Sequence, residues 1–113
     1  MEIKPSQAEQ TRVLAISGRL DSLTSPELEG SIQAALDALP PALVLDFTGV
    51  DFVSSAGLRV LLSAAKRCRK QSTKLALHSL QPHIAEVFDM SGLTAFLPTH
   101  PDRADALAAV PRG

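Results

Sequence analysis

The sequence predicts an α/β fold, with residues 1–113 forming a single domain in which about four helices pack on a mixed β-sheet with a parallel centre. Strand-like and helix-like segments alternate in the order β-β-α-β-α-β-α-β-α, which is typical of parallel strands connected by helices. The central segment, residues 43–47, is almost continuously apolar, as expected for a strand buried on both faces. A length of 113 residues fits one compact domain.

The first two strands are expected to form a hairpin. Residues 1–6 can form the first strand, residues 13–17 are the stronger candidate for the second, and residues 7–10 can turn between them. Gly18 is expected to end the second strand.

The first helix is expected to begin near Thr24 and to stop at Pro40-Pro41. Either Thr24 and Glu27 form a capping box, or Ser25 caps the helix with Pro26 at its first position. Apolar residues at helical spacing should form its buried face: Leu28, Ile32, Ala35, Leu36 and Leu39.

The central strand is followed by a short turn and a second helix over residues 55–70. Its inner face should contain Leu58, Leu61, Leu62 and Ala65, and the cations near its end complement the helix dipole. The remaining segments continue the alternation: a strand at 74–78, a helix at 82–91 stopped by Gly92, a short strand at 95–97 and a weaker helix at 101–110.

Composition excludes several classes of function. The formal net charge of −1 argues against a broad nucleic-acid or membrane-surface role. Cys68 is the one cysteine, so no internal disulfide can form, and we expect it to be a buried apolar residue. No apolar run approaches the ~18 residues of a membrane span, and the N-terminal residues lack the apolar stretch of a signal peptide. We therefore expect a cytoplasmic location.

No cofactor or metal is expected. His78, His83 and His100 lack the spacing of metal ligands and are predicted to lie on the surface. No glycine-rich phosphate loop precedes a Lys-Ser or Lys-Thr pair.

The strongest candidate site lies where the central strand meets the second helix. Polar side chains gather there: Asp46, Thr48, Asp51, Ser54 and Ser55. Hydroxyls at a helix N-terminus lie beside free backbone N–H groups and the positive end of the dipole, where a phosphate on serine is tolerated. Gly57 would allow another backbone or a partner to approach closely. Alternatively, one serine merely caps the helix and Gly57 packs against a neighbouring element.

Three ordered motifs resemble the STAS family, to which the bacterial anti-sigma factor antagonists belong. Val50-Asp-Phe-Val-Ser-Ser-Ala-Gly-Leu58 is similar to the family's Asp-Ser-Ser/Thr-Gly-Leu segment at the start of a helix. Val87-Phe-Asp-Met-Ser-Gly-Leu93 is similar to its late Phe-Asp-Met-Ser-Gly-Leu motif, and Gly18-Arg-Leu-Asp21 to its Gly-Glu-Leu-Asp.

The resemblance implies roles for particular residues. Ser55 falls on the family's phosphoacceptor serine, Gly57 and Leu58 fall on its Gly-Leu, and Asp21 falls on an acidic residue in the loop near that serine. Ser54 stands where many members have Asp, which leaves it as a rival acceptor, and Ala56 stands where they have Ser or Thr. Asp21 can equally be a turn residue before the first helix.

The resemblance also implies a function. The unmodified protein would bind an anti-sigma factor that is a serine kinase, and so free the sigma factor. The kinase, with its own ATP and magnesium, would phosphorylate the serine and end the complex, and a PP2C-type phosphatase would restore it. Around Ser55, we expect the kinase to contact Asp21, Ser54, Gly57, Leu58 and Arg59. The free protein is expected to be a monomer.

The sequence is compatible with two alternative functions. Val53-Ser-Ser-Ala-Gly57 is similar to the hydrolase nucleophile elbow but lacks its first glycine, and the short chain leaves little room for a triad. The other alternative is a STAS accessory or scaffold subunit of a transport or signalling complex.

Overall fold

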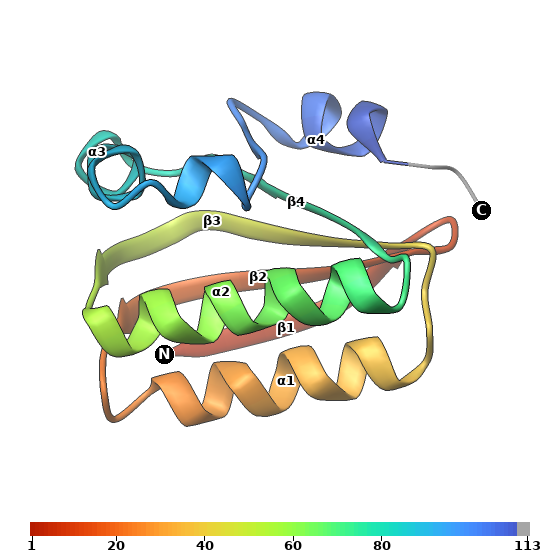
Figure 1. The fold of residues 1–113 in the computed structure, drawn as a ribbon, viewed down its shortest axis with the longest axis horizontal. Coiled ribbons are helices and arrows are strands. Elements are labelled where there is room, and N and C mark those ends of the chain that lie inside the picture. Colours follow the sequence, from red (N-terminus) through yellow and green to blue (C-terminus); the bar gives the residue numbers. More distant parts are fainter. Residues whose placement is uncertain (111–113) are drawn as a thin grey trace.

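The computed structural model describes residues 1–110 (Figure 1). Five strands form one sheet in the order β1-β2-β3-β4-β5. The hairpin of β1 and β2 is antiparallel, and the remaining neighbours pair in parallel. The strands are β1 (Glu2–Ala8), β2 (Thr11–Leu20), β3 (Ala42–Val53), β4 (Lys74–His78) and β5 (Thr99–His100). The mixed sheet with a parallel centre is thus confirmed.

Within residues 1–110, four α-helices and one short 3-10 helix connect and follow these strands. They are α1 (Ser25–Asp37), α2 (Ser55–Lys70), α3 (Pro82–Met90), η1 (Leu93–Ala95) and α4 (Arg103–Ala109). Helices α1 and α2 run side by side along the sheet, as Figure 1 shows. The predicted element order and the second helix over residues 55–70 are confirmed.

Each face of the sheet carries a hydrophobic core. In β3, Leu43 and Leu45 point into the larger core, which includes the buried residues of α1, α2 and α3. Val44, between them, points to a smaller core on the opposite face, which includes Ala106 of α4. Alternation of side chains along a strand explains why Leu43, Val44 and Leu45 are all apolar.

The central strands extend further than the sequence predicted. We expected β3 to end at Phe47, but it continues to Val53 because β2 also continues and pairs with it as far as Leu20. Gly18 therefore lies inside β2 rather than ending it. It adopts a φ of +102°, beside a shift in the strand register, and this conformation favours glycine.

Two predictions were wrong: the strand at 95–97 and the burial of Leu39. The expected strand at 95–97 is absent; Leu93 and Leu97 are both buried, and Leu97 N donates to Leu93 O at 2.9 Å, so the segment is a helical turn. Leu39 is 71% exposed rather than buried, because α1 ends at Asp37 and the backbone at Leu39 has a φ of +53°.

Candidate functional site

The junction between β3 and α2 gives the two neighbouring serines different environments. Ser54 is the N-cap of α2: its Oγ accepts a hydrogen bond from Gly57 N at 3.3 Å, and its own N–H donates to Leu20 O at 2.8 Å. Ser55 is the first helical residue and is exposed, and within residues 1–110 its hydroxyl has no hydrogen-bond partner. Capping therefore occupies Ser54 and leaves the Ser55 hydroxyl accessible.

Gly57 allows α2 to lie against the end of β2. A Cβ atom at this position would be 2.6 Å from Leu20 Cγ and 3.1 Å from Leu20 O. Gly57 is buried, so its role in the structure is this close packing. Leu58 is only half-buried and packs against the larger core.

Asp21 organises the loop that leads from β2 into α1. Its Oδ1 accepts hydrogen bonds from Leu23 N and Thr24 N, both at 3.0 Å, and lies 3.2 Å from Thr24 Oγ1. The backbone N–H of Thr24 is the largest cause of a lowered pKa of the Asp21 carboxyl group. The carboxylate thus serves the loop's own structure.

The prediction that Thr24 and Glu27 form a capping box was wrong. Thr24 is the N-cap of α1, but its side chain makes no capping hydrogen bond. Its Oγ1 instead donates to Arg19 O at 2.6 Å and accepts from Asp21 N at 2.9 Å. The alternative cap, Ser25, belongs to the helix itself, and its hydroxyl donates to Asp21 O. Pro26 does lie in the first turn, as expected.

Arg19 and Phe52 form a cluster that sequence reasoning missed. The Arg19 Cζ atom lies 4.1 Å from the centroid of the Phe52 ring, and Arg19 Nε lies 3.9 Å from Asp21 Oδ2. The two residues are register partners on β2 and β3. The sequence predicted that both strands end before these positions, so the contact between the two side chains could not be predicted. Leu23, on the loop between β2 and α1, is 88% exposed.

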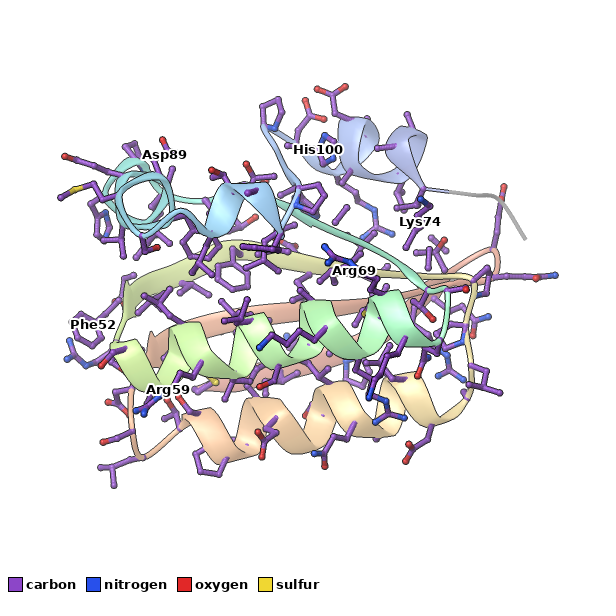
Figure 2. The ribbon with its side chains drawn as sticks, in the orientation of Figure 1. Phe52, Arg59, Arg69, Lys74, Asp89 and His100 are labelled. Carbon is purple, nitrogen blue, oxygen red and sulfur yellow. The ribbon has the colours of Figure 1, made fainter. Side chains whose placement is uncertain are left out.

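Arg59 lies one helical turn after Ser55. Its side chain is exposed, and Figure 2 shows it at the N-terminal part of α2, at the same end of the molecule as Phe52. It borders a hollow of about 260 Å³ between the first turns of α1 and α2. The lining residues are Ser22, Ser25, Pro26, Glu29, Ala56, Arg59, Val60 and Ser63.

Most of the predicted site residues meet at this end of the molecule. Because Ser54 N bonds to Leu20 O, the loop containing Asp21 lies next to the start of α2. Asp21, Ser54, Ser55 and Arg59 therefore flank one surface. Asp46, by contrast, lies further back in β3, where its Oδ1 accepts from Thr48 N at 2.9 Å.

Comparison with known proteins supplies the family. A sequence model of the STAS domain matches residues 2–106. This chain belongs to the STAS domain family. BtrV of Bordetella bronchiseptica, a proposed anti-sigma factor antagonist, is 34% identical over 109 residues, which are 96% of this chain and 94% of BtrV.

Solved STAS structures share this fold. An anti-sigma factor antagonist from Mycobacterium paratuberculosis superposes with a TM-score of 0.90 at 30% identity, covering 96% of this chain and 92% of that one. The phosphorylated form of the Bacillus cell fate determinant SpoIIAA has a TM-score of 0.73 at 18% identity, covering 95% of this chain and 97% of that one, and shows the fold alone. The chain is therefore similar to anti-sigma factor antagonists over nearly its whole length.

The histidines of this STAS domain do not all lie on the surface. His78 is 2% exposed, so our prediction was wrong for it. It pairs in register with Asp46 on the face of the sheet that carries the smaller core, and its Nδ1 lies 2.8 Å from Ser79 Oγ and 3.8 Å from Asp46 Oδ1. His83 is exposed, and its Nε2 lies 2.7 Å from Asp51 O.

Cys68 is buried, as predicted, and this burial raises its pKa to about 11. Among residues 1–110, no cluster of three or more His, Cys, Asp or Glu side chains could hold a metal ion. Within the same residues, no helix has the length and apolar character needed to cross a membrane.

Proposed function

We propose that this STAS domain is a phosphorylation-switched anti-sigma factor antagonist. In its unphosphorylated form it binds a serine-kinase anti-sigma factor, frees the sigma factor and thereby regulates transcription in the cytoplasm. The family and the similarity to BtrV support the antagonist role. The observation that carries the switch is the exposed hydroxyl of Ser55 beside a neighbour, Ser54, whose hydroxyl already caps the helix.

Ser55 is the acceptor in this proposal, and the kinase supplies ATP and magnesium. The Ser55 oxygen attacks the γ-phosphorus of ATP, the bond to the β-phosphate oxygen breaks, ADP leaves, and the hydroxyl proton passes to the kinase or to water. Ser54 is the poorer acceptor because its phosphorylation would disturb the cap on Gly57 N. The free Ser55 hydroxyl requires no such rearrangement.

The phosphate acts through charge. It adds about −1.5 to −2 charges at neutral pH, and this charge opposes any interface built around a neutral hydroxyl. The positive end of the α2 dipole favours the phosphate, so the domain remains folded while the complex dissociates. The phosphorylated form of SpoIIAA has this same fold.

The kinase covers the surface around Ser55. It contacts the loop of Asp21, the junction at Ser54, the first turn of α2 at Gly57 and Leu58, and Arg59, because its ATP must come within bonding reach of the Ser55 hydroxyl. The free protein is a monomer, since the exposed edge strand β1 carries Pro5, which weakens edge-to-edge pairing. A PP2C-type phosphatase resets the switch.

The testing experiment uses the serine-kinase anti-sigma factors of the source organism. Each is incubated with the protein and ATP, and residues 54–55 are analysed by mass spectrometry. We expect phosphate on Ser55, no phosphorylation of Ser55→Ala, and continued phosphorylation of Ser54→Ala. Phosphate on Ser54, with Ser55→Ala still modified, would contradict the assignment. Binding without phosphorylation by any kinase would favour the accessory or scaffold role.

A further inference from the structure

We propose that Arg59 is the intramolecular partner of a phosphate on Ser55. Phosphorylation then also withdraws this cation from the kinase-binding surface. The inference rests on the proposed function of Ser55 and adds a second residue to the switch.

The positions on α2 bring the two residues together. Ser55 is the first residue of the helix and Arg59 is four residues later, so both lie on the same side, one turn apart. Long side chains in helices point back towards the N-terminus, which brings the turn that begins at Ser55 within reach of an arginine at position 59. Both side chains are exposed, and within residues 1–110 neither has a hydrogen bond or ion pair that the contact would have to break.

Arg59 is available for this contact, whereas the other arginines of α2 and the arginine near the end of β2 have partners of their own. Arg67 Nη2 lies 2.7 Å from Asp37 Oδ1, and Arg69 Cζ lies 5.7 Å from the centroid of the Phe96 ring. Arg19 is held by Phe52 and Asp21. Within residues 1–110, Arg59 has no ion pair, side-chain hydrogen bond or aromatic partner.

The chemistry of the two groups matches. A phosphate has three strong acceptor oxygens, and a guanidinium presents N–H donors in a planar fork that can pair with two of them. The helix does not offer Gly57 N for this purpose, because that group already donates to Ser54 Oγ. Arg59 is therefore the cation that forms an ion pair with a phosphate on Ser55.

A competition follows from this pairing. In the unmodified protein, Arg59 is free to bind an acidic group of the kinase. After phosphorylation, the same guanidinium is held by the phosphate four residues away. The kinase complex then loses an attractive contact at the position where it also meets a new negative charge.

The direct test needs no kinase. Phosphoserine is incorporated at position 55 during translation of the full chain, and the second pKa of the phosphate is measured by ³¹P NMR. We expect this pKa to be lower by about 0.3 units in the parent protein than in Arg59→Gln, because a paired cation favours the doubly charged phosphate. Arg59→Lys should retain much of the shift.

The matched control is Lys66→Gln. Lys66 is another exposed cation of α2, but it lies three turns from Ser55. Its removal should leave the phosphate pKa at the parent value. Equal pKa values in the parent protein and Arg59→Gln would overturn the inference.

Calorimetry against the kinase tests the competition itself. Phosphorylation should reduce the affinity for the kinase in both the parent protein and Arg59→Gln. The factor of this reduction should be about two- to fivefold larger for the parent protein, since the variant has no cation to withdraw. Equal factors would overturn the competition. A kinase that binds neither form would contradict the proposed function, and the NMR measurement would still decide whether Arg59 holds the phosphate.

Discussion

Gly57 lies so close to Leu20 that a Cβ atom at position 57 would be 2.6 Å from Leu20 Cγ. Leu20 also accepts a hydrogen bond through its carbonyl oxygen from Ser54 N, at 2.8 Å. The last residue of β2 therefore fixes both the cap and the first turn of α2. The position of Ser55 depends on this contact between elements that are far apart in the sequence.

Gly57→Ala should destabilise the protein by about 1–3 kcal/mol, because the added methyl group overpacks a site bounded by Leu20. The free energy of unfolding in urea measures the effect. The control is Gly30→Ala in the exposed middle of α1, where a Cβ atom would have no neighbour within 4 Å. That change should stabilise by about 0.5–1 kcal/mol, because glycine is a poor helix former. Equal effects of the two substitutions would show that Gly57 is not tightly packed.

Substitution of Ser54 should lower the free energy of unfolding more than substitution of Ser55. Ser54→Ala removes the acceptor for Gly57 N and should cost about 1 kcal/mol, as loss of an N-cap does. Ser55→Ala removes an exposed hydroxyl and should change the free energy of unfolding by less than about 0.5 kcal/mol. Thermal and urea denaturation of both variants provide the comparison. A larger loss for Ser55→Ala would show that Ser55 has a structural role.

The larger core should be sensitive to truncation at Leu61. This residue is fully buried on α2, and Leu61→Ala should cost about 2–5 kcal/mol through lost contacts and the cavity left behind. Leu39→Ala is the matched control, because Leu39 is exposed and should change stability by no more than about 0.5 kcal/mol. An unfolding midpoint unchanged by Leu61→Ala would mean that α2 presents another face to the sheet.

Local pattern was sufficient for the main elements of this fold. The apolar spacing in α1 and α2 and the continuous apolar run of β3 correctly indicated helices and a central strand. The extension of β3 to Val53 was not predictable in this way. Polar residues such as Thr48 and Asp51 favour a turn, and only the pairing of their neighbours Gly49, Val50 and Phe52 with the extended β2 keeps this segment in a strand.

The candidate site was predictable in part. The pattern placed Ser54, Ser55 and Gly57 at the start of a helix, but it could not say which serine was the cap. The Arg19–Phe52 contact depends on the register between β2 and β3, which local sequence does not specify. The burial of His78 likewise follows from its place beside Asp46 in the sheet.

The loop of Asp21 should make stability depend on pH. The pKa of this carboxyl group is lowered in the folded protein from its ordinary value of 3.8, first through the N–H of Thr24. A lowered folded pKa means that the ionised group contributes stability above the unfolded pKa, and that this contribution is lost as the pH falls through the folded pKa. Asp21→Asn keeps an oxygen for the loop but removes the charge.

The stability advantage of the parent protein over Asp21→Asn should therefore be constant from about pH 7 to about pH 5, and should shrink as the pH falls below 3.8. Urea denaturation at a series of pH values measures it. The control is Gln33→Ala, which changes an exposed residue of α1 that has no titratable group. Its difference from the parent protein should not change with pH across the same range. A pH-independent difference for Asp21→Asn would show that the charge of Asp21 does not stabilise the loop.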